Sequence, residues 1–391
     1  MIQNQTPYAI SDEVKMMLET VRRFRLQDLE PIWQQVDEED RMPEEVVQKM
    51  RELGLFGMAT PKDYGGLGLT ALEEAMVQEE LSKSAGCFRS RIAGTNGIGC
   101  QGIVIDGTEE QKSKYLPKFA SGEWTAAFAM TEPDAGSDAA SIKTKAELKG
   151  DHWVLNGTKQ FITNGPSANL ITVMAVTDPE KRARGGITAF LVENTFPGFK
   201  RGAVDSGMGL RGNPTCQLIF DDCIVPRENV IGGDKMIGSG FKTAMRIMDK
   251  GRLFIAAHAL GGAQRCLELA AEYAKTRVQF GKPIAEFQLI QGMLAEMATD
   301  VHASRQMLYH TAWLRDKFGT QVLKEASMVK LFCTEAALRV VNKAVQIHGG
   351  YGWQKGYHVE RFYRDLRLLT IFEGTSEIQK VVISRELLKE V

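Results

Sequence analysis

The chain shows no excess of charge of either sign and no long apolar run. Its 48 Lys and Arg residues nearly balance its 49 Asp and Glu residues, and the formal net charge is −1. This balance gives no support to binding of nucleic acid or of an anionic membrane as the main function. No apolar run reaches the ~18 residues that a membrane-spanning helix needs. Residues 1–6 lack a basic segment followed by an apolar one, so no secretory signal is predicted.

Cysteine and histidine are few and scattered. The six cysteines include no Cys-x-x-Cys pair, which is typical of reduced cysteines packed inside a cytosolic protein and predicts a cytoplasmic location. The six histidines include no His-x-x-x-His pair or other ligand cluster, so no metal site is predicted.

The first part of the chain has a helical pattern. The 391 residues are enough for two or three domains. Within residues 1–123, apolar side chains such as Val14, Met17 and Val21 recur at helical spacing. This pattern predicts an N-terminal helical domain.

Short alternating runs replace the helical pattern in residues 124–236. Runs such as 171–176 and 187–192 are separated by turns that contain Gly, Asn, Asp and Pro. Because no helices lie between them to build a parallel sheet, these runs predict a middle antiparallel β-barrel or sandwich.

The helical period returns in residues 237–391. Long segments with few internal Gly or Pro residues predict a C-terminal four-helix bundle, with helices at roughly 240–275, 285–317, 320–348 and 376–390. The predicted fold is therefore mainly α with a central β domain.

The strongest candidate for chemistry lies in residues 368–379. Four of the five residues 368–372 are apolar, so we expect this run to be buried. Glu373 follows at once, and Gly374 frees the backbone for a sharp turn. A carboxylate at the end of a buried run suits a general base, because desolvation raises its pKa toward the working pH.

Two further expectations concern the same stretch. Ser376 and Gln379 have the spacing of a capping box, so we expect a helix to begin there. Glu373 could instead form an ion pair with Arg364 or Arg367, and its position alone does not decide between an ion pair and a base.

A glycine pattern in the middle of the chain is misleading. Gly207, Gly209 and Gly212 match Gly-x-Gly-x-x-Gly, the dinucleotide-binding fingerprint, which requires a helix directly afterwards. Residues 213–215 lead into a strand-like run instead, so we predict no site of that kind.

Residues 364–367 and 374–379 (Arg-Asp-Leu-Arg and Gly-Thr-Ser-Glu-Ile-Gln) resemble the C-terminal signature of the flavin-dependent acyl-CoA dehydrogenases. Other motifs follow in that family's order and spacing, and the resemblance covers nearly the whole chain. It implies the same three-part architecture, FAD as cofactor, and a homo-oligomer, commonly a tetramer, with FAD at its interface. It also implies that reduced flavin passes electrons to an electron-transferring flavoprotein.

The resemblance assigns flavin contacts to two segments of the β domain. Residues 128–138 end an apolar run in a polar turn, whose donors suit the carbonyl-rich edge of a flavin. Residues 161–165 bring an aromatic ring and a hydroxyl near flavin N5. By themselves these segments would be an ordinary turn and a hairpin edge. Many family members have tryptophan where this chain has Phe161.

The resemblance also assigns contacts in the helical bundle. Segments matching 277–288 and 346–350 hold the FAD pyrophosphate and adenosine, partly from a neighbouring subunit, and the planar fork of Arg277 matches phosphate oxygens. The residues implied to contact FAD are Phe128, Met130, Thr131, Gly136, Ser137, Phe161, Ile162, Thr163, Arg277, Gln279, Phe280, Phe287, Gln288, Gln346, Gly349, Gly350, Thr375 and Glu377.

For catalysis, the resemblance implies that Glu373 is the base. Some branches of the family place the base at the position matching Gly251, where glycine cannot serve. Glu373 would take the α-proton of an acyl-CoA thioester while the β-hydrogen leaves as hydride to flavin N5, giving a trans-2-enoyl-CoA. The Glu373 N–H and a ribityl hydroxyl of FAD would stabilise the thioester oxygen.

The implied substrate residues are less specific. Ser137, Asp249, Arg252 and Gly374 match family positions near the thioester or CoA, and residues 87–97, with Arg89, Arg91 and Thr95, match the acyl end of the pocket. Phe88-Arg89-Ser90 is similar to a stretch of glutaryl-CoA dehydrogenases whose arginine holds the substrate's distal carboxylate. Arg89 or Arg91 could do this here, or could be solvated or structural. A short, medium, cyclic or dicarboxylic acyl group stays open.

Several rival functions use the same architecture. An enoyl-CoA reductase would use the same residues in reverse. Acyl-CoA oxidases and flavin monooxygenases are oxygen-using relatives, although the monooxygenases generally lack a glutamate at the position of Glu373. A flavin-binding scaffold or nucleic-acid-binding relative is disfavoured by the retained Glu373 and the balanced charge.

Overall fold

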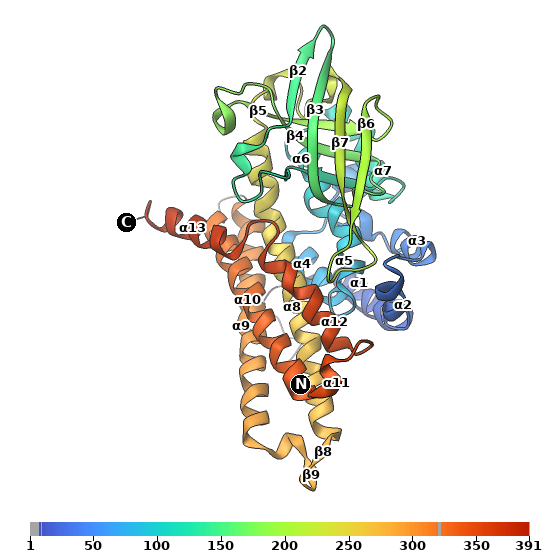
Figure 1. Cartoon of the computed structure of the whole chain (residues 1–391), viewed down its shortest axis with the longest axis vertical. Coiled ribbons are helices and arrows are strands. Elements are labelled where there is room, and N and C mark those ends of the chain that lie inside the picture. The colour runs from blue at the N-terminus through green and yellow to red at the C-terminus, as the bar shows by residue number, and fades with distance from the viewer. Residues whose placement is uncertain (1–7, 9, 320–321, 391) are drawn as a thin grey trace.

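The computed structural model describes residue 8 and residues 10–319 and 322–390. Residues 1–6, on which the absence of a signal rests, lie outside the described residues, as do 320–321 at the start of the third predicted bundle helix. A β-sheet forms one end of the molecule, long helices run away from it, and the N-terminal helices pack at the side where the two meet (Figure 1). The mainly helical fold with a central sheet is confirmed.

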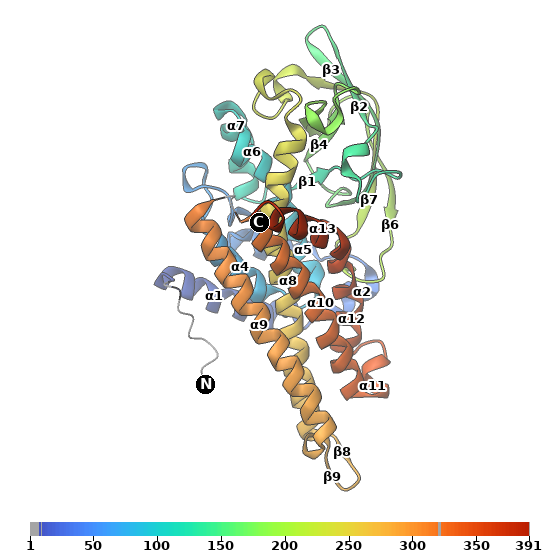
Figure 2. The ribbon, with the colours of Figure 1, turned by 90° about the vertical axis from the view of Figure 1, so that its left-hand side faces the viewer.

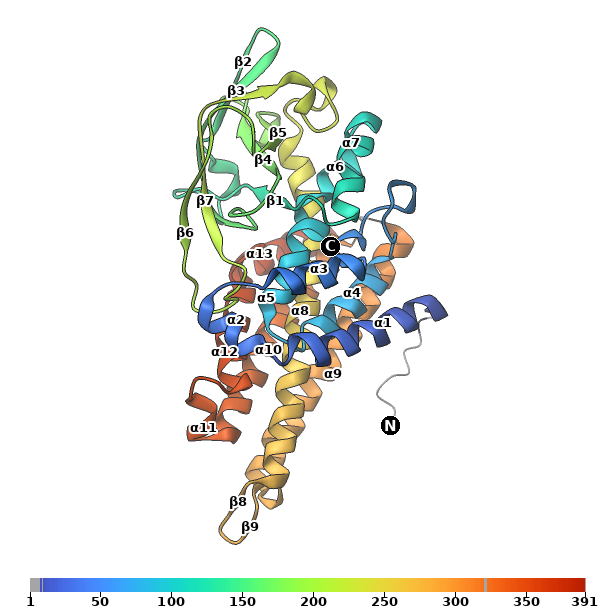
Figure 3. The same ribbon diagram turned by 90° about the vertical axis from the view of Figure 1, so that its right-hand side faces the viewer.

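The N-terminal region is helical, and side-chain caps define several of its helices. Thr70 and Thr108 each form a capping box with the residue three positions later, so α4 and α7 begin directly after them. The α-helices are α1 (Asp12–Phe24), α2 (Trp33–Glu39), α3 (Glu44–Glu52), α4 (Ala71–Leu81), α5 (Gly86–Ala93), α6 (Gln101–Asp106) and α7 (Glu109–Ala120), with a π-helical turn η4 (Gly94–Gly99) between α5 and α6. Figure 3 shows α4 next to α1 and near the long helix α8 (Gly240–Thr276).

The middle region is a single curled sheet. Its strands are β1 (Ala126–Ala129), β2 (Lys145–Lys149), β3 (His152–Thr163), β4 (Leu170–Val176), β5 (Ile187–Glu193), β6 (Phe199–Asp205) and β7 (Thr215–Pro226). In the described part of the chain the strand order is β1-β4-β2-β3-β7-β6, with β5 beside β4. β7 follows the Gly-x-Gly-x-x-Gly loop directly, which confirms that no helix stands there to bind a dinucleotide.

The prediction of purely antiparallel strands is wrong for two pairings. β1 pairs with β4 in parallel, and β2 meets β4 in parallel at its end. The other ladders, β2–β3, β3–β7, β4–β5 and β6–β7, are antiparallel. Alternation in a sequence reveals a strand but not its partner, so the return of β4 alongside β1 after the β2–β3 hairpin could not be predicted from the pattern.

The predicted bundle helices are present with slightly different bounds. They are α8 (Gly240–Thr276), α9 (Gln288–Phe318), α10 (Leu323–His348) and α13 (Ser376–Leu387). Figure 2 shows α8, α9 and α10 side by side, and their buried apolar faces form one core with α4. α8 and α9 are joined by the hairpin of β8 (Val278–Gln279) and β9 (Lys282–Pro283).

The structure adds two helices that the sequence pattern had not indicated, α11 (Gly350–Trp353) and α12 (His358–Arg367). Val359, Phe362 and Leu366 are buried on one face of α12 and lie at helical spacing, so the signal was present. In the part of the chain that the structure covers, no helix combines the length and apolar character needed to cross a bilayer. All six cysteines are free and buried.

Candidate active site

Glu373 lies on a sharp bend between a 3₁₀ turn, η10 (Leu368–Thr370), and α13. Its φ is +51° and that of Gly374 is +89°, so two successive residues take the left-handed conformation. The expectation that residues 368–372 are all buried is wrong in part, because Leu369 is buried but Ile371 is 48% exposed. The run folds as a 3₁₀ turn, and its side chains therefore spread to different sides.

The N-cap of α13 lies one residue earlier than the predicted cap, Ser376. Thr375 is the N-cap, and its hydroxyl accepts a hydrogen bond from Ile378 N at 3.3 Å. Ser376 is the first helical residue and donates to Glu335 Oε1 at 2.6 Å. Gln379 does not complete a capping box with Ser376, and its amide donates to the carbonyls of Glu373 (3.2 Å) and Gly374 (3.0 Å). The helix start was therefore predicted correctly but its capping was not.

The carboxyl group of Glu373 points inward against α8. Its Oε2 is buried and, among the described residues, has no hydrogen-bond partner. A Cβ at Gly251 would overlap this oxygen, so the carboxyl group of Glu373 lies directly against the backbone of α8 at that point. Burial raises the pKa of Glu373 above its ordinary value, against the opposing effects of Arg89, Lys330 and Arg252. A desolvated carboxylate without a fixed partner is free to take a proton from a ligand.

The alternative that Glu373 only pairs with a neighbouring arginine is wrong. Arg364 binds Asp37 at 2.7 Å and Glu360 at 2.8 Å. Arg367 donates to the Thr370 hydroxyl. Both arginines are therefore engaged elsewhere.

Three cations approach Glu373 from three helices. Arg89 comes from α5, Arg252 from α8 and Lys330 from α10, and all three are buried. The Arg252 guanidinium donates to Asp249 at 2.7 Å, so a carboxylate on the same helix already balances its charge. The buried carboxyl group of Glu373 thus has positive charge nearby from three helices.

A buried ion pair between Lys159 and Glu132 anchors the segment from β1 to Ser137. Lys159, which is fully buried on β3, donates to Glu132 at 2.8 Å and to the Met130 carbonyl at 3.0 Å. Phe128 and Met130 are buried, Thr131 is half-buried, and Gly136 and Ser137 are exposed. The turn therefore presents its polar residues outward on a rigid base.

The segment 161–163 lies next to that turn. Gln160 N donates to Thr131 O at 2.9 Å, which joins the two motifs directly. Phe161 is 64% exposed with φ +59°, at a break in the β3–β7 register, while Ile162 is buried and Thr163 half-buried. An exposed aromatic ring on strained backbone is typical of a binding surface rather than of packing.

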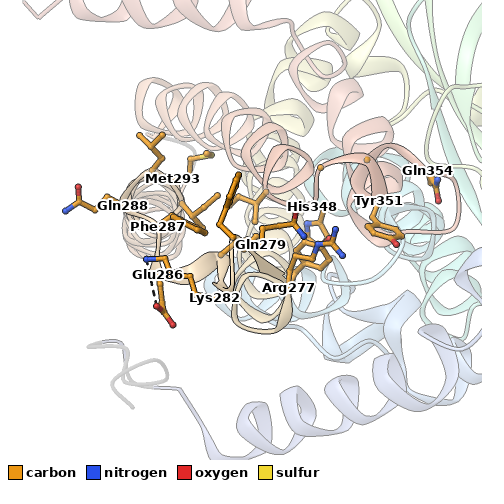
Figure 4. Close-up of a pocket in the computed structure, with 18 residues that line it drawn as sticks. Arg277, Gln279, Lys282, Glu286, Phe287, Gln288, Met293, His348, Tyr351 and Gln354 are labelled. Atoms are coloured by element: carbon orange, nitrogen blue, oxygen red, sulfur yellow. Dashed lines mark ion pairs between the residues drawn. The ribbon is translucent and has the colours of Figure 1, made fainter.

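A groove opens at the hairpin end of the bundle (Figure 4). It has a volume of about 1020 Å³ and includes Arg277, Gln279, Phe280, Phe287, Gln288, Gly349 and Gly350 among its lining residues. The rings of Tyr273 and His348 stack at 4.3 Å in its wall. Gln346 is exposed and is not part of the lining. The hairpin lies at the end of the bundle away from α13 and the sheet (Figure 1).

The three residues predicted at the acyl end of the substrate, Arg89, Arg91 and Thr95, have different surroundings. Arg89 Nε donates to Gln78 Oε1 at 2.6 Å, and the residue is only 3% exposed. Arg91 points away and donates to Ser167 Oγ at 2.9 Å. The Thr95 hydroxyl accepts from Ala126 N at 3.1 Å, where η4 meets β1. Of the two arginines, Arg89 is the one whose charge acts on Glu373.

Two contacts at the bend were not predicted from the sequence. Lys330 was not singled out, and Gln379 was expected to cap the helix but not to donate to the carbonyls of the bend. Lys330 donates to the Gly374 carbonyl at 2.8 Å and is fully buried. The signal available was a lysine on the apolar face of a helix, between Ala326, Val329 and Cys333. A charged residue is almost never fully buried there without a partner.

Known proteins and family models are similar to this chain over nearly its whole length. Models of the acyl-CoA dehydrogenase N-terminal, middle and C-terminal domains match residues 11–123, 127–223 and 238–388. The acryloyl-CoA reductase (NADH) of Anaerotignum propionicum is 43% identical over 98% of this chain and 96% of its own length. The 3-(aryl)acrylate reductase of Clostridium sporogenes is 42% identical over 97% and 99%.

Solved structures agree closely in fold. A chain in a structure of the electron transferring flavoprotein of Acidaminococcus fermentans superposes with a TM-score of 0.94 at 39% identity, covering 98% of this chain and 100% of that one. Butyryl-CoA dehydrogenase from Megasphaera elsdenii gives 0.94 at 37% identity, with 98% and 100% covered. A glutaryl-CoA dehydrogenase in complex with glutaryl-CoA gives 0.93 at 36% identity, with 98% and 97% covered.

Proposed function

The chain belongs to the acyl-CoA dehydrogenase family, and we propose that it interconverts an acyl-CoA thioester and its trans-2-enoyl-CoA with Glu373 as the α-proton base. The observation that carries this proposal is the buried, unpartnered carboxyl oxygen of Glu373, held on a left-handed bend. The α-proton of a thioester is weakly acidic. A carboxylate whose pKa is raised by burial is a better base for it than an exposed one.

The backbone of the same bend supplies a donor for the thioester oxygen. The Glu373 N–H donates to no group in the described ranges. As the α-proton leaves, negative charge develops on the thioester oxygen, and a donor placed there stabilises it by several kcal/mol. We assign this role to the Glu373 N–H, so that one residue both removes the proton and binds the developing charge.

The enzyme depends on FAD, as its family does, and its residues fit that group. The turn at Gly136 faces open space, Phe161 exposes its ring beside Thr131, and the groove at Arg277 offers a permanent cation for a diphosphate. Bound FAD supplies the acceptor for the hydrogen that leaves the β-carbon. The predicted residues of segments 128–137 and 161–163, with Thr375 and Glu377, would hold the flavin end, and those lining the groove would hold the adenine end.

We propose a homotetramer in which the groove of one subunit completes the FAD site of another. The groove and the Glu373 bend lie apart within one chain (Figure 1), and Phe280 at the hairpin tip is 95% exposed. Such a ring on a groove rim suits a contact with a second copy. A cytoplasmic location stays a prediction from the sequence.

The direction of the reaction and its redox partner belong to the same proposal. We propose dehydrogenation, with electrons passed to an electron-transferring flavoprotein, supported by the Acidaminococcus fermentans chain at 39% identity. The second candidate is enoyl-CoA reduction. It is favoured by the names of the two reductases at 42% and 43% identity.

The buried Arg89 near Glu373 leads us to propose a short acyl group with a carboxylate or other polar end. The terminal nitrogens of Arg89 donate to no described residue, although its Nε is bound to Gln78. A buried guanidinium with free donors favours an anionic or polar partner over an alkyl chain. Arg91 cannot serve while it is bound to Ser167.

The test of the reaction is anaerobic flavin bleaching with a panel of acyl-CoAs, and flavin reoxidation with the matching enoyl-CoAs. Glu373→Gln should lower the rate of bleaching by about 10²–10⁴-fold and leave FAD bound, because only the base is lost. Bleaching at an unchanged rate would disprove the role of Glu373. Oxygen consumption measured in air separates a dehydrogenase from an oxidase.

The test of the acyl assignment compares glutaryl-CoA with butyryl-CoA. Arg89→Ala should lower kcat/KM for glutaryl-CoA far more than for butyryl-CoA, because only glutaryl-CoA carries a distal carboxylate. Arg91→Ala is the matched control on the same helix and should not change the ratio. Equal losses for both substrates in Arg89→Ala would show that Arg89 does not read the acyl end.

A further inference from the structure

Lys330 is a buried lysine next to the proposed base that no step of the reaction has used. It is 0% exposed, and its ammonium makes a single hydrogen bond, to the Gly374 carbonyl at 2.8 Å. Across the described residues it forms no ion pair. Burial lowers its pKa to about 8. A buried ammonium without a carboxylate partner is costly, so its presence calls for a reason other than stability.

The contact of Lys330 falls on the bend that carries Glu373. The carbonyls of Glu373 and Gly374 both accept from Gln379 on α13, and Lys330 on α10 adds a second donor to Gly374. Donors from two helices therefore hold a peptide segment with two successive left-handed residues. Glu335, five residues further along α10, anchors Ser376 just after the bend.

The charge of Lys330 also acts on the Glu373 carboxyl. The charged groups that face Glu373 are Arg89, Lys330 and Arg252. Arg252 is balanced by Asp249 at 2.7 Å. Arg89 and Lys330 are thus the two facing cations that bind no carboxylate within the described residues.

The charged groups around Lys330 itself are Glu373, Arg252, Glu335 and Glu377. The Glu335 carboxylate accepts from the Ser376 hydroxyl, and Glu377 is exposed at the first turn of α13. Glu373 has the largest electrostatic effect on Lys330 of these four.

We propose that Lys330 is a positioning residue for Glu373, which sets the bend through the Gly374 carbonyl and favours the carboxylate form of the base. This inference rests on the proposed function of Glu373. The hydrogen bond fixes where the Glu373 carboxyl and N–H point. The charge favours the ionised form of Glu373, against the opposing effect of burial.

The experiment measures kcat/KM against pH for Lys330→Gln, Lys330→Met and Lys330→Arg. Glutamine keeps a donor but loses the charge, methionine loses both, and arginine keeps the charge. The acid limb of the profile should move up by about one pH unit in Lys330→Gln and Lys330→Met, because a nearby cation is removed. It should stay in place in Lys330→Arg. The plateau kcat should fall further in Lys330→Met than in Lys330→Gln, since methionine leaves the Gly374 carbonyl with the Gln379 amide as its one remaining donor among the described residues.

Ser376→Ala is the control, because it loosens the same junction between α10 and α13 without changing the charge near Glu373. Its acid limb should stay in place. An acid limb unmoved in both Lys330→Gln and Lys330→Met would overturn the proposal, as would an equal shift in Ser376→Ala. If Glu373→Gln keeps full activity, the proposed function itself fails; if Glu373→Gln is inactive and the limbs do not move, only the role of Lys330 fails. Lys330→Gln keeps the test open if Lys330→Met does not fold.

Discussion

The buried pair of Lys159 and Glu132 should control both the stability of the β domain and the retention of FAD. Lys159 is 0% exposed and Glu132 is 6% exposed, and their charged atoms are 2.8 Å apart. Lys159 also holds the Met130 carbonyl, at the end of β1, where the predicted flavin turn begins. Lys159→Met removes the cation and leaves the carboxylate buried.

The expected loss of stability in Lys159→Met depends on the hydrogen bonds that Glu132 retains. Breaking a buried pair by removing one partner costs roughly 3–5 kcal/mol. Glu132 still accepts from Lys143 N at 2.6 Å and Thr144 N at 2.9 Å, so we expect the lower end, about 3 kcal/mol. Adding Glu132→Gln removes the stranded charge. The double variant should therefore be more stable than Lys159→Met alone.

The assay is urea unfolding of the four proteins of this double-mutant cycle, followed by circular dichroism, with FAD affinity measured by reconstitution. Lys143→Met is the matched control, because its ammonium pairs with Asp134 on the surface and should contribute nothing measurable. The double variant should also bind FAD more tightly than Lys159→Met. The reasoning is refuted if the double variant is as unstable as the sum of its single variants, because no charge would then have been stranded.

Three further predictions follow from the site. Gly251→Ala places a methyl group against Glu373 Oε2 and should lower kcat by about 10²-fold with the fold retained. The control is Gly292→Ala, whose new methyl group meets nothing within 4 Å and should leave kcat unchanged. Equal kcat values for the two variants would contradict the close approach of Glu373 to α8. Because the base must be ionised, kcat/KM should rise with pH through the raised pKa of Glu373, and an acid limb at or below the ordinary glutamate pKa would count against burial as the cause. Arg277→Ala should raise the Kd for FAD by more than about tenfold, as expected for the loss of a charged hydrogen bond. Lys275→Ala removes an exposed cation two residues earlier and should leave the Kd unchanged. An equal rise in Kd for both variants would show that Arg277 contributes only its positive charge and no specific contact with FAD.

The bend at Glu373 and the helix after it could be predicted because their signal is local. An apolar run, a glutamate and a glycine in succession specify a carboxylate on a turn, and the following residues start a helix. The order of a helical region, a β region and a second helical region likewise follows from side-chain periodicity, because helices and strands have different periods. These features depend on neighbours in the chain.

Other features depended on partners far away in the chain. Arg89 and Arg91 lie two residues apart on α5, and a helix turns about 200° over that interval, so the sequence predicts opposite directions but not which of them meets the base. The placement of Arg91 against Ser167 decides this. The parallel pairing of β1 with β4 is of the same kind, since a strand pattern does not name its partner.

The sequence by itself determined the family and the three-part organisation, and it singled out Glu373 as the candidate base, because each of these is written in contiguous motifs. Only the tertiary structure decided what surrounds that base. Gly251 from α8 makes room for the carboxyl, and Arg89 and Lys330 bring positive charge from α5 and α10. The pKa of Glu373 depends on burial and on the distances to these charges, and both arise only when segments nearly 300 residues apart in the chain pack together.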